Sequence, residues 1–294
     1  MSESRGVSQK VCANDGVSSS YEILDVPNSK RGVFILLPAM GVPSRFYRPF
    51  AKTLNVQGYS VVMTDLRGVG SSSVRASRHQ NFGYEEMISL DIPTLIKEVK
   101  QDYTDQPIFL IGHSLGGQLS CLHQSCCQQS ERVDAIILIG APSVYYKGWS
   151  FPFNFGALVF THSSWILSKV MGYFPGNRLG FGGRQSERVI ADWANFSRTG
   201  QFNLSKSERD YDLALSKLDI NILCLSFADD HYAPQKTVNN LINKMPGAAI
   251  CHDHLTSRQL GSTSVDHFNW IHRGEVLSVI ISSWLGGALN LIDV

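Results

Sequence analysis

The feature that most constrains this chain is a serine placed between two glycines directly after an apolar run. Residues 108–111 are Ile-Phe-Leu-Ile and read as a buried strand. The pattern Gly112-x-Ser114-x-Gly116 follows, and helix-compatible sequence begins at Gln118. Small residues two positions before and after the serine permit a sharp turn in which larger side chains would collide. We therefore predict a strand, a tight turn and a helix, with the Ser114 hydroxyl clear of the backbone.

This turn has the form of a nucleophile elbow, in which the serine attacks a carbonyl carbon. The helix that follows would point its N–H groups and the positive end of its dipole at the oxygen that becomes negative. The N–H of Leu115, directly after the serine, is one expected donor to that oxygen. The alternative interpretation is a glycine-rich turn with an idle serine, so other parts of the chain must support the elbow.

Composition excludes several classes of protein. The chain has 294 residues, 43% of them hydrophobic and 17% charged, which suits one large α/β domain or two small ones. Its net charge of +1 gives no electrostatic reason to expect binding to nucleic acid or to an anionic membrane. Residues 1–8 have no apolar core, so we expect no secretory signal. The most apolar segment, 156–174, is interrupted by His162 and Lys169, so we expect no membrane span.

The cysteine pattern favours free thiols. The six cysteines are scattered without CxxC spacing, which, with no signal segment, favours a cytoplasmic protein. Cys251-His252-Asp253-His254 resembles a set of metal ligands. It lies in a strand-like run, however, and alternate side chains of a strand point to opposite faces. We therefore expect no metal site there, and nothing in the sequence calls for a cofactor.

Apolar strands alternate with helical segments over the first half of the chain. An opening hairpin is predicted on either side of Asn14-Asp15-Gly16. We predict four strands after it, at 33–37, 60–64, 108–113 and 135–140, with helices between them, and a helix over 87–103 that Pro93 either kinks or starts. Such alternation is typical of an α/β fold with a mostly parallel sheet flanked by helices, whose functional loops lie at the carboxyl ends of the strands.

The alternation stops between residues 143 and 215. We therefore predict a core made of residues 1–142 and 216–294, with strands at 221–226 and 248–254, and a helical, aromatic-rich insertion at 143–215. The insertion either packs against the edge of the sheet or forms a cap whose apolar inner wall binds substrate. We favour the cap because the insertion follows a strand whose carboxyl end should neighbour Ser114. Tyr145 and Trp149 are candidate substrate contacts.

A serine hydroxyl needs a base to accept its proton and a carboxylate to orient that base. Asp229 and Asp230 both follow the predicted strand at 221–226, and we prefer Asp230 as the acid. His267 lies in a loop after the last strand and is the preferred base. His113, beside the serine, is interpreted as a packing residue, and His231 as a loop residue. The second oxyanion donor should come from the loop after strand 33–37, at the N–H of Met40.

Five motifs in order along the chain carry a family resemblance: Leu37-Pro38-Ala39-Met40-Gly41, residues 65–73 (DLRGVGSSS), residues 112–117 (GHSLGG), Asp230-His231-Tyr232-Ala233-Pro234 and Asp266-His267-Phe268. The chain resembles the α/β-hydrolase superfamily, in which serine, acid and histidine follow in this order. Within it, residues 37–47 look like a bacterial group of hydrolases distantly similar to monoacylglycerol lipases and serine aminopeptidases. Many relatives have His-Gly in place of Pro38-Ala39.

The resemblance and the residues together predict a serine hydrolase that cleaves a carboxylic ester or thioester with an apolar or aromatic acyl group. One alternative is an acyltransferase or lactonising enzyme, in which an alcohol or amine captures the same acyl-enzyme. An amidase or aminopeptidase would need an acidic subsite for a free amino group. A third class is a non-catalytic small-molecule-binding protein on the same fold.

Overall fold

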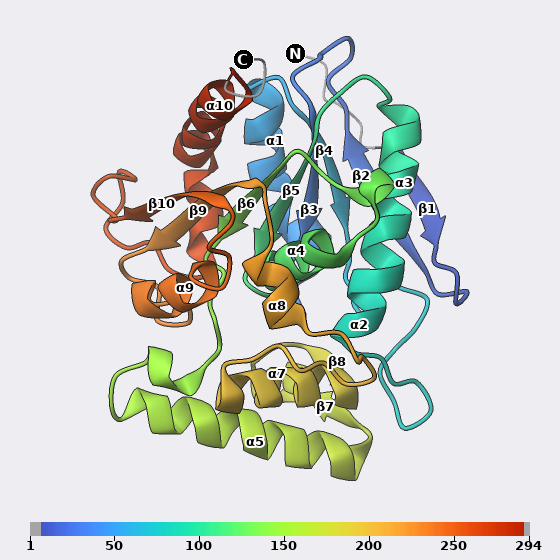
Figure 1. Ribbon diagram of the computed structural model, residues 1–294, viewed down its shortest axis with the longest axis vertical. Helices are drawn as coiled ribbons and strands as arrows, with labels where there is room; N and C mark the ends of the chain where they lie inside the picture. Colours follow the sequence, from blue (N-terminus) through green and yellow to red (C-terminus); the bar gives the residue numbers. More distant parts are fainter. Residues whose placement is uncertain (1–6, 291–294) are drawn as a thin grey trace.

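The computed structural model describes residues 7–290. Residues 1–6, on which most of the expectation about a signal segment rests, lie outside the described residues, as do residues 291–294. The core of the structure is an eight-stranded sheet with helices on both faces (Figure 1).

The sheet has the strand order β1-β2-β4-β3-β5-β6-β9-β10. Its strands are β1 Val7–Cys12, β2 Ser18–Leu24, β3 Val33–Leu37, β4 Ser60–Thr64, β5 Ile108–His113, β6 Ala135–Ile139, β9 Asn221–Phe227 and β10 Ala249–Leu255. The pairs from β4 to β10 are parallel, whereas the hairpin β1–β2 and the pair β2–β4 are antiparallel. The predicted α/β class and mostly parallel sheet are therefore confirmed.

The core helices divide between the two faces of the sheet. They are α1 Arg48–Val56, α2 Tyr84–Glu86, α3 Ile92–Asp102, α4 Leu115–Cys126, α9 Gln235–Ile242 and α10 Gly274–Asn290. Buried side chains of α1 and α10 pack on one face, and those of α3, α4 and α9 pack on the other. Side chains of β3 pack on both faces of the sheet: Val33 and Ile35 lie on the α4 side and Phe34 lies on the α1 side. This alternation follows from the two-residue period of a strand.

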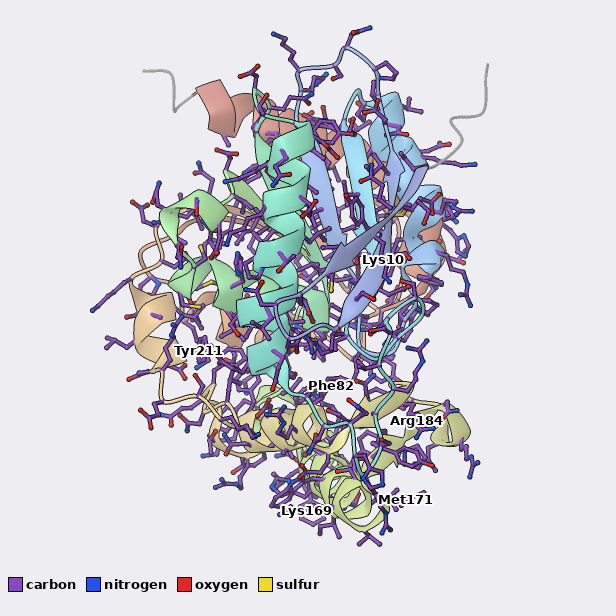
Figure 2. The ribbon with its side chains drawn as sticks, turned by 90° about the vertical axis from the view of Figure 1, so that its right-hand side faces the viewer. Lys10, Phe82, Lys169, Met171, Arg184 and Tyr211 are labelled. Carbon is purple, nitrogen blue, oxygen red and sulfur yellow. The ribbon has the colours of Figure 1, made fainter. Side chains whose placement is uncertain are left out.

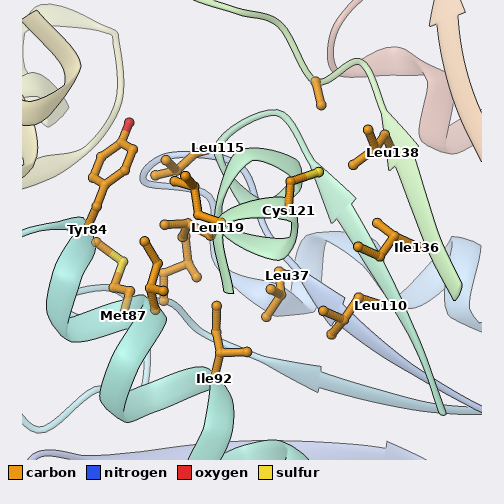
Figure 3. Packing of buried hydrophobic residues seen from close by; sticks show 14 of the residues in the cluster. Leu37, Tyr84, Met87, Ile92, Leu110, Leu115, Leu119, Cys121, Ile136 and Leu138 are labelled. Carbon is orange, nitrogen blue, oxygen red and sulfur yellow. The ribbon is translucent and has the colours of Figure 1, made fainter. Parts of the chain in front are cut away.

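Figure 3 shows the α4 side, where helix side chains meet those of the central strands, among them Leu115, Leu119, Leu37, Leu110 and Ile136. Each of these five side chains is almost fully buried. Strands β3, β5 and β6 are covered on both faces of the sheet, which explains why their sequences are continuous apolar runs. Their packing holds the end of β5, and with it the turn between β5 and α4, in place.

The helix predicted over 87–103 is interrupted. A π-helical turn at Met87–Asp91 links α2 to α3, and Pro93 lies in the first turn of α3. Proline has no N–H, so it is tolerated in a first turn, where that group would have no partner within the helix. Pro93 therefore starts a helix, which is one of the two outcomes expected for it.

The insertion, which we define as residues 143–215, lies between β6 and β9. It contains α5 Phe153–Met171, β7 Tyr173–Pro175, α6 Gly176–Leu179, β8 Arg184–Ser186 and α7 Glu187–Thr199, and α8 Tyr211–Ser216 overlaps its end. Helices α5 and α7 and the antiparallel pair β7–β8 form a layer beyond one end of the sheet, whereas α8 lies against α4 (Figure 1). No helix within residues 7–290 has the length and apolarity needed to cross a membrane.

Candidate functional site

The turn between β5 and α4 holds Ser114 in a strained conformation. Its φ of 53° and ψ of −114° lie in a sparsely populated region, at a cost of about 1–3 kcal/mol. A Cβ on Gly112 would lie 2.4 Å from Gly117 Cα, and one on Gly116 would lie 2.1 Å from the carbonyl oxygen of Leu37. Both glycines are therefore required by close backbone approach, which is the steric reason for the motif.

Asp230 and His267 are brought together from two loops at the same end of the sheet. His267 Nδ1 donates to Asp230 Oδ2 at 2.8 Å, and both side chains are almost fully buried. The other carboxylate oxygen, Oδ1, accepts the backbone N–H groups of Tyr232 at 2.9 Å and Ala233 at 2.8 Å. The carboxylate is thus fixed by two backbone N–H groups of its own loop and by the ring that it orients.

Asp229 has different partners. Its Oδ2 accepts from the Ser257 hydroxyl and from the Val265 N–H, and these hydrogen bonds hold the pKa of the Asp229 carboxyl below its usual value. Val265 precedes His267 by two residues. Asp229 therefore fastens the loop that carries the histidine, whereas Asp230 contacts the ring itself.

Ser114 and His267 line one cavity of about 490 Å³, together with Met40 and Leu115. Much of the remaining wall is aromatic: Trp149, Phe153, Phe160, Phe181, Trp193, Tyr232 and Phe268. Of the two insertion residues proposed as substrate contacts, Trp149 lines the cavity. Tyr145 lies outside it, with its ring packed against Gly200.

The proposed nucleophile and the expected oxyanion donors make no hydrogen bond among residues 7–290. The Ser114 hydroxyl makes no hydrogen bond within this part of the chain, and neither does the Met40 N–H. The Leu115 N–H belongs to the first turn of α4, whose N–H groups have no acceptor within the helix. Long or absent contacts of this kind are common in catalytic sites without substrate.

His113 lies under the elbow, in contact with three aromatic rings. Trp270 Nε1 donates to His113 Nε2 at 3.3 Å, so a neutral ring carries its proton on Nδ1, which lies 2.7 Å from Tyr47 Oη. Burial, reinforced by the neighbouring His267, lowers the pKa of His113 well below its usual value. Its neutral ring therefore packs beside His267 without adding a charge there.

Tyr47 connects this group to the loop after β3. Its Oη accepts the N–H of Ala39 at 2.9 Å, and Ala39 precedes Met40. Burial raises the pKa of Tyr47, which keeps the phenol neutral. The loop that holds one expected oxyanion donor is thus tied to the residue beside the serine.

Two polar cavity residues were absent from our sequence predictions. Tyr84 Oη donates to Gln118 Oε1 at 3.3 Å, and Gln118 Nε2 donates to the Pro142 carbonyl at 2.8 Å. Figure 3 shows the Tyr84 hydroxyl pointing away from the packed side chains of the α4 cluster. Gln118 could have been found, because it follows Ser114 by about one helical turn. Nothing local in the sequence marks Tyr84.

A second, more open hollow of about 390 Å³ adjoins the first and shares four residues with it: His231, Tyr232, His267 and Phe268. His231 also accepts the Trp149 indole N–H through its carbonyl oxygen, at 3.3 Å. The His267 side chain therefore borders both the main cavity and this second hollow.

The Cys251–His254 segment forms part of the edge strand β10. His252 Nε2 and His254 Nδ1 both lie 2.8 Å from Ser226 Oγ, so the two rings share one face. Within the described part of the chain, no three or more His, Cys, Asp or Glu side chains are grouped so as to hold a metal ion.

Comparison with known proteins places this fold in a family. Residues 28–191 match the family described as serine aminopeptidase, S33. No curated protein matches the sequence.

Solved structures match the chain at low identity over nearly its full length. An esterase from Exiguobacterium antarcticum matches with a TM-score of 0.61 and 17% identity, over 95% of this chain and 99% of its own. The monoacylglycerol lipase of Paleococcus ferrophilus gives 0.60 and 15%, over 97% and 99%. Est1E from Butyrivibrio proteoclasticus, solved with ferulic acid, gives 0.62 and 13%, over 94% and 97%. These likenesses show the fold, and the family match over more than half of the chain shows that it belongs to the serine aminopeptidase S33 family of α/β hydrolases.

Proposed function

We propose that this serine hydrolase cleaves a carboxylic ester or thioester through an acyl-enzyme on Ser114. The observation that carries the proposal is the cavity into which Ser114 and His267 both face, with His267 bonded to the buried Asp230. A nucleophile, a base and an orienting carboxylate in one place are the parts that acyl transfer needs.

The proposed reaction runs in two halves. His267 Nε2 accepts the Ser114 proton as Oγ attacks the carbonyl carbon, and Asp230 stabilises the imidazolium through Nδ1–H. The N–H groups of Met40 and Leu115 donate to the oxyanion. The proton then passes to the leaving alcohol or thiol. Water, deprotonated by His267, attacks the acyl-enzyme and releases the acid and the serine.

The cavity wall supports an uncharged apolar or aromatic acyl group. The residues that line the main cavity include no Asp or Glu, so it offers no counter-ion to the free amino group of an aminopeptidase substrate. We propose that the insertion acts as a cap that supplies the aromatic side of this cavity. The adjoining hollow beside His267 gives the leaving group and the attacking water a separate route.

The first experiment is hydrolysis of p-nitrophenyl esters from acetate to palmitate by the wild-type protein and by Ser114→Ala. We expect turnover with a chain-length optimum in the wild type and a loss of about 10³-fold or more in the variant. Equal melting temperatures would show that the fold is intact. A variant with near wild-type turnover would remove Ser114 from the mechanism.

The identity of the acid has its own test with a neighbouring control. Asp230→Asn should lower kcat by about 10²–10⁴-fold, because the orienting carboxylate of His267 is lost. Asp229→Asn should retain kcat within about threefold, since Asp229 contacts the loop and not the ring. Reversed effects would assign the acid to Asp229.

Two alternatives remain distinguishable by their products. Transfer to an added alcohol, or lactone release from a hydroxyacyl ester, would identify an acyltransferase or lactonising enzyme that uses the same acyl-enzyme. A non-catalytic binding protein would not be labelled at Ser114 by a fluorophosphonate, which intact mass spectrometry detects.

A further inference from the structure

Helix α5 of the insertion carries an apolar stripe on its exposed side. The side chains of Phe155, Val159, Ile166 and Val170 are spaced by four, seven and four residues, so they form one stripe along the helix. Each is between 50% and 68% exposed. In a helix that merely covers a core, such a stripe would face inward. We call these four residues the outer stripe.

The opposite side of α5 is small and polar. Thr161, Ser164 and Ser168 are its three most buried residues and lie about half a turn from the outer stripe. Thr161 donates to the Ser197 hydroxyl of α7 at 3.1 Å. Small residues allow α5 to approach α7 closely, and Phe160 packs against Phe181 and Trp193 on another side of the helix, so the four side chains of the outer stripe are left without such contacts.

The outer stripe lies at the periphery of the molecule. Figure 1 places α5 at the end farthest from α1 and α10. Figure 2 shows Lys169 and Met171 at the outer edge of the insertion, with Arg184 beside them. A stripe of this kind on an outlying helix marks an interaction surface.

The charged residues near the outer stripe indicate the kind of partner that it binds. From residue 135 to residue 186 the chain contains no Asp or Glu but four cations, Lys147, Lys169, Arg178 and Arg184. The net charge of +1 conceals this local excess. Glu187 is the first carboxylate after the segment, and it shares a shallow surface hollow with Arg78 and Lys169, so that corner also stays positive.

We propose that the outer stripe docks on an anionic lipid surface. An apolar helix face flanked by cations and aromatic side chains has the composition of a helix that lies in the plane of a membrane interface. A second copy of the chain is a poorer occupant, because two such faces would bring cations together, and residues 135–186 supply no carboxylate to pair with them. Phe153 and Phe160 of the same helix line the main cavity, about a third of a turn around the helix from the outer stripe.

The test is co-sedimentation with phosphatidylcholine vesicles prepared with and without phosphatidylglycerol. Wild-type protein should bind the phosphatidylglycerol vesicles, and less so at high salt. Val159→Ser combined with Ile166→Ser should weaken binding by about tenfold or more, since two apolar side chains leave the interface. Lys169→Gln combined with Arg178→Gln should weaken binding only to the anionic vesicles.

A matched control tests whether a loss of binding depends on where the exposed apolar residues lie, and not merely on the removal of two of them. Val56 and Val279 are also exposed but lie on α1 and α10, so Val56→Ser with Val279→Ser should bind like the wild type. Neither pair of apolar residues lines the cavity, so hydrolysis of a short soluble ester should be unchanged in both. That assay and the melting temperature verify folding, and the docking proposal does not depend on the proposed reaction.

Three results would overturn the proposal: no binding of the wild type to anionic vesicles, equal binding by the stripe variant, or equal loss in the α1/α10 control. A dimer that forms without lipid and is abolished by Val159→Ser with Ile166→Ser would assign the face to a second copy instead.

Discussion

At the scale of single residues, the candidate site depends on a phenol that never faces the cavity. Tyr47 accepts the Ala39 N–H and contacts His113, so it joins the loop of Met40 to the base of the elbow. Such a group acts by positioning, because it lies behind the residues that would touch substrate. Its removal should therefore change the rate more than substrate binding.

We predict that Tyr47→Phe lowers kcat by about tenfold, less than the ~10²–10³ lost when an oxyanion donor is removed outright. The KM should change by less than about twofold. Stability should fall by about 1–3 kcal/mol, because the buried Ala39 N–H loses its acceptor. The control is Tyr59→Phe, whose hydroxyl accepts only from Arg31 among the described residues. A larger effect on KM than on kcat would contradict the positioning role.

Residue-level prediction is most direct where close backbone approach requires a particular local sequence. The elbow glycines could be placed because backbone approach excludes every larger residue. The partner of His267 could not be derived from sequence, since Asp229 and Asp230 both follow β9. The choice depends on which side chain the turn directs toward the ring, and Tyr232 and Ala233 fix that direction through their N–H groups.

At the scale of elements, the loop after β3 is in backbone contact with the β7–β8 connection of the insertion. Gly41 has a φ of 71°, and a Cβ on it would lie 2.2 Å from the carbonyl oxygen of Gly182. The insertion therefore touches the loop that holds the expected oxyanion donor.

Gly41→Ala should destabilise the protein by more than about 2 kcal/mol and reduce ester hydrolysis, because the methyl group drives the two segments apart. Gly180→Ala is the matched control, since its φ of 74° is similar but nothing lies within 4 Å of an added Cβ. It should cost about 1 kcal/mol, which is the conformational penalty alone. Denaturant unfolding measures both, and equal costs would exclude a steric effect at Gly41.

Sequence periodicity found the core elements better than those of the insertion. Strands buried on both faces are continuous apolar runs, which explains why β3, β4, β5 and β6 were predicted within one residue of their observed bounds. Helix α5 has no such signature, because four of its apolar side chains form an exposed stripe and its most buried residues, Thr161, Ser164 and Ser168, are small and polar. The two-stranded sheet β7–β8 is too short to show an alternating pattern.

At the scale of the whole molecule, one carboxylate joins the insertion to the core. Asp192 of α7 accepts the N–H of Tyr84 at 3.0 Å and that of Ser205 at 2.6 Å. Burial, the largest influence on it, raises its pKa to about 6 from an ordinary value of 3.8. The folded protein therefore favours the protonated form more than the unfolded chain does.

Stability from this group is complete below pH 3.8 and is lost as the pH rises through about 6. We predict that the free energy of unfolding of the wild type, relative to Asp192→Asn, falls by up to about 3 kcal/mol between these values. Urea unfolding at a series of pH values measures the difference. The exposed Glu208, changed to Gln, should leave the pH dependence as in the wild type. Parallel pH profiles for the wild type and Asp192→Asn would contradict the raised pKa.

The order of the strands along the chain also separates the parts of the proposed triad. Strands β3, β4, β5 and β6 are adjacent in the sheet and are synthesised early, so the elbow can form on the ribosome. The proposed acid, Asp230, follows β9, and the proposed base, His267, follows β10 and packs against the ring of His113. A chain interrupted before β10 would therefore carry the proposed nucleophile without its proposed base, and we expect it to be inert toward esters.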